Sequence, residues 1–171
     1  SLSRRLGVRS VVLKGNGSAH APPDDLYSLC DHADLVHHLI LQKDLRQLTL
    51  VGHSMGGGVA LLVALRLLKE ERLERLVLVS SAAYPQHLPP FIALAGRGRL
   101  SEWGLRFVPK RFLIRSVLRS IVFDREGVTD AQVEAYANPL FSPAHRTALI
   151  TTATRIIPPD LADLTRRIPE I

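Results

Sequence analysis

Cysteine and aromatic residues are scarce in this chain. Cys30 is the single cysteine among 171 residues, which excludes an internal disulfide framework and a zinc site built from several cysteines. We expect Cys30 to be a small buried residue of a helix. Aromatic residues make up 5% of the chain and no nucleic-acid-binding motif is present, so the net charge of +6 does not indicate a nucleic-acid partner. Arginine-rich helix faces in contact with solvent explain the positive charge better, and contact of these faces with a lipid surface is the alternative.

Long apolar runs are also missing. The longest, Met55 to Leu65, has eleven residues, whereas a membrane-spanning helix needs about twenty. The first residues do not resemble a signal peptide, so we expect no integral membrane segment and a cytoplasmic location. Apolar residues make up 46% of the chain and charged residues 22%, which is ordinary for a globular protein.

The first half of the chain alternates between apolar strands and helices. Strands are expected at Val8–Leu13, Leu48–Val51 and Leu76–Val79 because each is a short apolar run bounded by turn residues. Helices are expected to about Gln42, after a capping box of Ser28 and Asp31, and from Met55 to Arg72. This order predicts an α/β fold with a parallel sheet of three strands, covered by helices on both faces.

The second half is broken by prolines and contains no further strand-like run. Helices are expected at Lys110–Phe123, at Asp130–Ala137 after a Thr129 cap, and at Arg146–Ile156. Basic residues gather between Arg97 and Arg119, where Glu102 is the single acid. We therefore expect a β/α core over residues 1–83 and an all-helical segment over residues 84–171.

The clearest functional motif is Gly52-His53-Ser54-Met55-Gly56, between a predicted strand and a predicted helix. A strand that turns directly into a helix holds the residue between them in strained backbone geometry, with its side chain exposed. We expect Gly52 and Gly56 to flank Ser54 because side chains there would collide across the turn. The Met55 N–H, at the positive end of the helix dipole, is placed to hold an oxyanion. A tight glycine-rich turn without chemistry is the alternative.

This motif resembles the nucleophile elbow of the α/β-hydrolase superfamily, in its Gly-His-Ser-Met-Gly-Gly form. Residues 11–18 resemble the strand and Gly-x-Gly-x-Ser loop that precede the elbow helix in that family, although Val12 replaces the usual Asp. The helices after Tyr84 resemble the family's lid. The resemblance implies a cofactor-independent serine hydrolase without a metal, in which Ser54 attacks a small apolar ester-like or carbonyl substrate.

The resemblance also shows what to look for elsewhere. The family's order along the chain is Ser, acid, His, and residues after Ser54 offer no acid and His in the expected places. The chain therefore resembles a central fragment that ends just before the post-lid strand. His87 and His145 are weak candidates for a base. His32, His37 and His38 lack the spacing of a metal site, and we expect them to be exposed or half-buried. The alternative to an active hydrolase is a catalytically incomplete fragment with at most a binding role.

Overall fold

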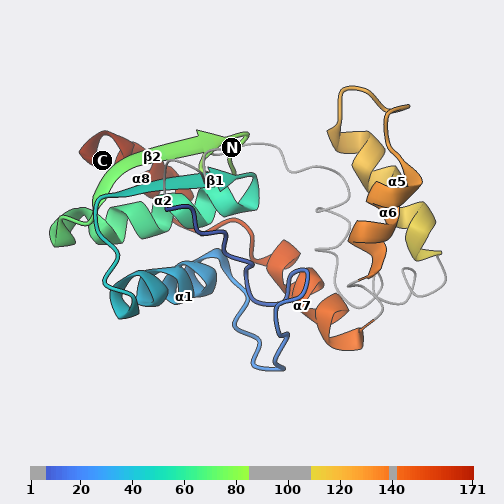
Figure 1. Ribbon diagram of the computed structural model, residues 1–171, viewed down its shortest axis with the longest axis horizontal. Helices are drawn as coiled ribbons and strands as arrows, with labels where there is room; N and C mark the ends of the chain where they lie inside the picture. The colour runs from blue at the N-terminus through green and yellow to red at the C-terminus, as the bar shows by residue number, and fades with distance from the viewer. Residues whose placement is uncertain (1–6, 85–108, 139–141) are drawn as a thin grey trace.

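The computed structural model describes residues 7–84, 109–138 and 142–171 (Figure 1). The bounds of its elements, in chain order, are α1 Leu29–Gln42, β1 Leu48–His53, α2 Met55–Leu67, η2 Leu68–Glu70, β2 Leu73–Val79, α5 Lys110–Ile121, α6 Asp130–Ala137, α7 Pro143–Thr154, α8 Leu161–Arg166 and η4 Ile168–Glu170. The predicted α/β class is confirmed. None of the described helices is both long enough and apolar enough to span a bilayer.

Strands β1 and β2 pair in parallel, with Val51 opposite Val77 and His53 opposite Val79. One face of this sheet carries the half-buried side chains of Leu50, Leu76 and Leu78, which pack against the clusters around α2. The other face is exposed. We call it the open sheet face, and it consists of Thr49, Val51, His53, Arg75, Val77 and Val79.

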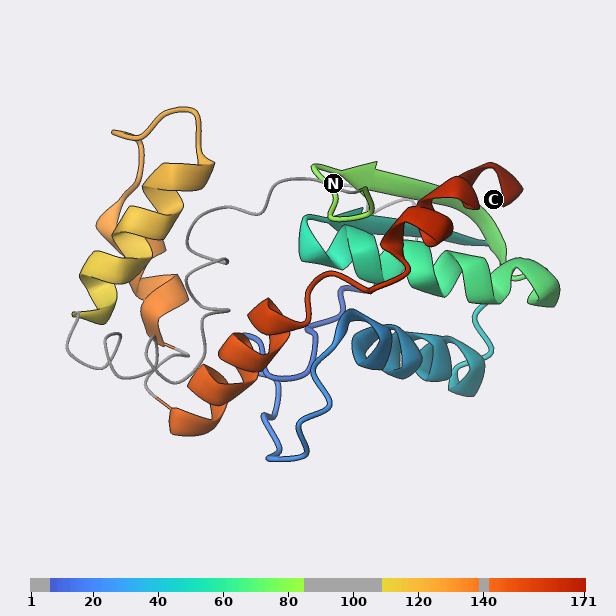
Figure 2. The same cartoon turned by 180° about the vertical axis from the view of Figure 1, so that it is seen from behind.

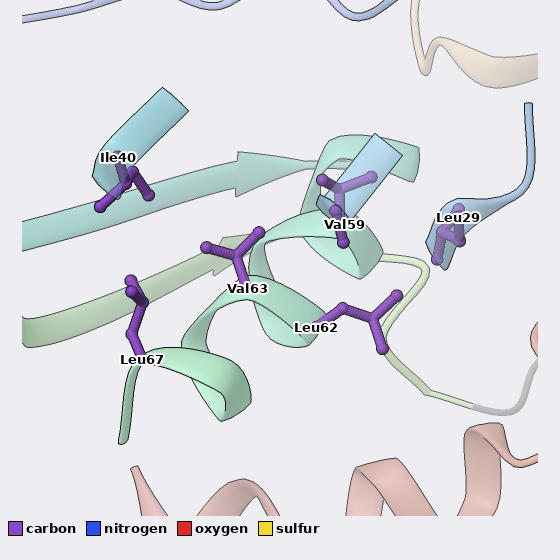
Figure 3. Close-up of a cluster of buried hydrophobic side chains, with 7 residues drawn as sticks. Leu29, Ile40, Val59, Leu62, Val63 and Leu67 are labelled. Carbon is purple, nitrogen blue, oxygen red and sulfur yellow. The ribbon is translucent and has the colours of Figure 1, made fainter. Parts of the chain in front are cut away.

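Nearly every residue of helix α2 is buried, which accounts for its apolar side chains on nearly every side. It lies between the sheet and α1, so that sheet, α2 and α1 form three layers (Figure 1). Figure 3 shows the main cluster, in which Val59, Leu62, Val63 and Leu67 of α2 gather with Leu29 and Ile40 of α1. A second cluster, around Leu61 and Leu65, receives Leu164 and Ile168 from the end of the chain.

The prediction of three strands covered on both faces was wrong for the part of the chain described. Residues 8–13 join no sheet, and Val8, Val11 and Val12 are exposed. A β-branched run favours extended backbone, but a strand forms only where a neighbour accepts its N–H and C=O groups. In the described residues β1 pairs with β2 alone, and no element covers the open sheet face.

Boundaries shifted where local geometry overrode periodicity. The helix predicted to reach Arg72 ends at Leu67, and a 3-10 turn follows before Glu71 adopts a left-handed φ of 50°. The capping boxes at Ser28–Asp31 and Thr129–Gln132 are both present.

Cys30 is exposed rather than buried, which corrects its predicted role as a core residue.

Helices α5 and α6 lie together, far from the sheet in both views (Figures 1 and 2). Arg111 pairs with Glu134 and Arg115 pairs with Asp130, so two of the arginines between residues 97 and 119 form ion pairs with acids of α6, and the Arg111 side chain stays exposed. Helices α7 and α8 return toward the core. Arg155 at the end of α7 holds both the carbonyl and the carboxylate of Asp25, each at 2.7 Å.

His32 is fully buried in the first turns of α1, although we expected the histidines of this helix to be exposed or half-buried. Neither ring nitrogen finds a hydrogen-bond partner among the described residues, and the ring meets Tyr27 edge-on. Burial is the main cause that lowers the pKa of His32 below its ordinary 6.5, and the Lys14 charge adds to it against the opposing Asp31.

His32 should therefore make the fold sensitive to acid. Because the lowered pKa belongs to the folded state, the unfolded chain takes up the proton more readily, and stability is lost as pH falls below about 6.5. We expect a loss of up to about 1.4 kcal/mol per pH unit. Urea unfolding from pH 7.5 to 4.5 should show this slope for the parent and for a His38→Leu control, whose ring is exposed. His32→Leu should flatten it, and an unchanged slope in that variant would contradict the assignment.

Candidate active site

Ser54 stands alone between the last residue of β1 and the first residue of α2. Its backbone has φ 52° and ψ −124°, outside the helix and strand regions, as the motif predicts. Such geometry costs a non-glycine residue about 1–3 kcal/mol, so the surrounding structure must hold it in place. The Ser54 side chain is exposed and does not cap α2. The elbow therefore presents an exposed hydroxyl at the carboxyl end of β1.

Three backbone hydrogen bonds hold this strained residue. The Ser54 N–H donates to the carbonyl of Val79 at 3.1 Å, which continues the pairing of β1 with β2. The Ser54 carbonyl accepts from the N–H of Gly57 at 3.0 Å and from the N–H of Ala82 at 2.9 Å. The Ser54 carbonyl is thus held by two hydrogen bonds, one from helix α2 and one from the turn after β2.

The glycines of the elbow permit this close packing. A Cβ at Gly52 would lie 2.4 Å from the carbonyl oxygen of Gly56, and one at Gly57 would lie 2.1 Å from the Ser81 hydroxyl. A Cβ at Gly58 would lie 2.5 Å from the Leu29 side chain. The prediction was right for Gly52 and wrong for Gly56, where an added Cβ meets no described atom within 4 Å outside its chain neighbours and the nearby backbone of its own helix. Gly56 lies in the first turn of α2 on a side with open space, so within this helix the steric demand falls on Gly57 and Gly58.

The N–H of Met55 is the first of α2, and a helix has no internal acceptor for its first N–H groups. It lies next to the Ser54 hydroxyl in sequence and at the positive end of the helix dipole. The Met55 side chain is half-buried against the main core cluster, which fixes the start of the helix. An anion that forms beside Ser54 would find a fixed donor here.

No histidine ring and no carboxylate in the described ranges hydrogen-bonds to Ser54. His53 is exposed on the open sheet face. The His145 ring bonds to the Ala19 carbonyl at 3.0 Å, and His37 bonds to Glu70 at 2.9 Å. His87, the other weak candidate for a base, lies outside the described residues. The described chain therefore contains the elbow without the rest of a catalytic triad.

Sequence reasoning did not predict that the turn after β2 packs against the elbow. Ser80 has a left-handed φ of 42°, and the Ser81 hydroxyl accepts from the N–H of Ala83 at 3.1 Å, which closes the turn against α2. The available signal was the run of three glycines at residues 56–58. It indicates that another backbone approaches the start of α2, but it does not say which one.

Comparison with known proteins defines the class to which this elbow belongs. The family model described as "alpha/beta hydrolase fold" matches residues 13–118, more than half of the chain. The chain belongs to the α/β-hydrolase fold family.

Two curated proteins and one solved structure show how much of this chain is similar to individual members. The chain is 32% identical over 133 residues to a 2-hydroxymuconate semialdehyde hydrolase of a Pseudomonas species, covering 78% of this chain and 43% of that protein. It is 36% identical over 101 residues to an uncharacterised protein of Mycobacterium tuberculosis, covering 59% of this chain and 29% of that one. A crystal structure of an α/β-hydrolase fold protein from Burkholderia ambifaria matches 91% of this chain and 56% of its own, with a TM-score of 0.73 and 20% identity. The chain thus spans less than half the length of these two curated relatives.

Proposed function

We propose that this chain carries the nucleophile of a serine hydrolase and that Ser54 is that nucleophile. The observation that carries the proposal is the backbone of Ser54, which is held in a strained conformation with an exposed side chain. Strain of this kind persists only where the surrounding structure over-determines it, and it gathers at functional sites. Membership of a hydrolase-fold family supports the same assignment.

In the proposed reaction the Ser54 Oγ attacks a carbonyl carbon as a base removes its proton. The carbonyl oxygen becomes negative and accepts a hydrogen bond from the Met55 N–H, within an elbow that Gly52, His53 and Gly56 complete. The bond to the leaving group then breaks and an acyl-enzyme remains on Ser54, which water hydrolyses. The base and its orienting acid would come from parts of the protein other than the described residues.

The substrate class we propose is a small apolar ester or an activated carbonyl compound whose C–C bond is cleaved. The second possibility draws on the Pseudomonas relative, whose name gives a semialdehyde as its substrate. We further propose that residues 1–83 form the core and that helices after residue 84 form a lid over the site. No cofactor or metal enters this scheme.

A fluorophosphonate probe tests the nucleophile directly. In a longer protein that contains these residues, we expect the probe to attach to Ser54, as located by peptide mass spectrometry. Ser54→Ala should abolish labelling, whereas Ser80→Ala, a serine in the turn after β2, should retain it. Labelling at another residue, or full labelling of the Ser54→Ala variant, would contradict the proposal. Turnover of p-nitrophenyl acetate and of 2-hydroxymuconate semialdehyde by the same protein would separate the two substrate classes.

The second candidate is an incomplete fragment with at most a binding role, and the lack of a described partner for Ser54 favours it. We expect the 171-residue chain alone to hydrolyse p-nitrophenyl esters at or near the rate of its Ser54→Ala variant, because a serine without a base is a weak nucleophile. Substantial turnover that is lost in Ser54→Ala and in His145→Ala would show instead that the base lies within this chain.

A further inference from the structure

The turn after β2 is held at both ends. At one end, the Ala82 N–H donates to the Ser54 carbonyl at 2.9 Å. At the other end, the carbonyl of Ala83 accepts from the Thr165 hydroxyl of α8 at 2.8 Å. Residues 82 and 83 are adjacent, so a single peptide unit separates the N–H that holds the elbow from the carbonyl that α8 holds.

Burial makes the contact with Thr165 important. Ala83 is fully buried in the cluster with Leu61 and Leu65 of α2, against which Leu164 and Ile168 pack. Figure 2 shows α8 beside α2 and the sheet. A buried carbonyl that loses its donor cannot turn to water without moving, so it costs more than an exposed one. The same hydroxyl lies 2.7 Å from the Leu161 carbonyl of its own helix. One hydroxyl has one proton, so these two carbonyls share it.

We propose that Thr165 is a positioning residue for Ser54, an inference that rests on the proposed function. Thr165 fixes the Ala83 carbonyl, the peptide unit between Ala82 and Ala83 links that carbonyl to the Ala82 N–H, and that N–H fixes the Ser54 carbonyl. The strained backbone of Ser54 requires such restraint from outside its own helix. Helix α8 thereby contributes to nucleophile geometry although it lies more than 100 residues after the elbow.

The test compares Thr165→Val, which keeps the shape and removes the hydroxyl, with Thr165→Ser, which keeps the hydroxyl. Thr147→Val is the matched control, because the Thr147 hydroxyl bonds only to the Pro143 carbonyl in its own helix among the described residues. The first measurement is amide hydrogen exchange at Ala82. Thr165→Val should exchange about three- to tenfold faster, the factor expected for one net hydrogen bond. Thr165→Ser and Thr147→Val should exchange at the parent rate.

The second measurement is the rate of fluorophosphonate labelling at Ser54 in the longer protein, which should fall about three- to tenfold in Thr165→Val and return in Thr165→Ser. Unchanged Ala82 exchange in Thr165→Val overturns the proposal. Equal acceleration at every amide of β1 and α2 also overturns it, because that would be a general loss of stability. If the parent does not label at Ser54, the proposed function fails, while the exchange data still decide whether Thr165 restrains the turn.

Discussion

Gly52→Ala should destabilise the protein by about 3 kcal/mol or more, the cost of severe overpacking in a filled site. The new Cβ would lie 2.4 Å from the carbonyl oxygen of Gly56 and 2.6 Å from the Cα of Gly57. Both are backbone atoms, so no side-chain rotation relieves the clash, and β1 and α2 must move apart. Urea unfolding of the longest soluble protein that contains these residues would measure the decrease in the free energy of unfolding.

Gly56→Ala is the matched control, in the same motif and with the same added methyl group. Apart from its chain neighbours and the nearby backbone of its own helix, no described atom lies within 4 Å of the new Cβ, and alanine favours the helix over glycine by up to about 1 kcal/mol. We therefore expect Gly56→Ala to be neutral or slightly stabilising. If the two variants lost equal stability, the clash at Gly52 would not explain the glycine at that position.

The contrast between these glycines shows how much of the site the sequence could predict. The Gly-x-Ser-x-Gly spacing predicts a strand, a strained serine and a helix, and the backbone of Ser54 has that form. The spacing cannot assign a steric reason to each glycine, because packing decides which atoms an added Cβ would meet: atoms of α2 at Gly52, and Ser81 in the turn after β2 at Gly57. Thr165 was invisible for the same reason, since its partner Ala83 is 82 residues away.

The same contrast holds for the fold: features set by neighbouring residues were predicted from the sequence, and features set by residues far away in the chain were not. The Ser28–Asp31 capping box, the Thr129 cap and the start of α2 depend on residues within one turn of the chain, and the sequence predicted them. The strand expected at Val8–Leu13 depends on a neighbour, and the local pattern says nothing about whether one is present. His32 failed for a related reason: the apolar stripe of α1 did not show that Tyr27 and the preceding loop would enclose its ring.

The 171-residue chain on its own should associate through the open sheet face. Val51, Val77 and Val79 are 67%, 42% and 45% exposed there, side by side on two paired strands. Clustered apolar surface of this kind, beside strands whose outer edges pair with no described strand, favours self-association. Size-exclusion chromatography with light scattering should detect dimers or larger species that grow with concentration. A monomer at all concentrations, with sharp cooperative unfolding, would contradict this.

Paired charges on that face should restore the monomer. Val51 and Val77 are register partners, so Val51→Lys with Val77→Glu places opposite charges across the two strands without changing the net charge. The control is Leu35→Lys with Leu41→Glu, which makes the same exchange at exposed leucines of α1. Because the sheet variant replaces two of the three exposed valines with charges and the control leaves all three, the sheet variant should elute as a monomer and the control should still associate. The opposite result would assign the association to α1, since both variants carry equal charge.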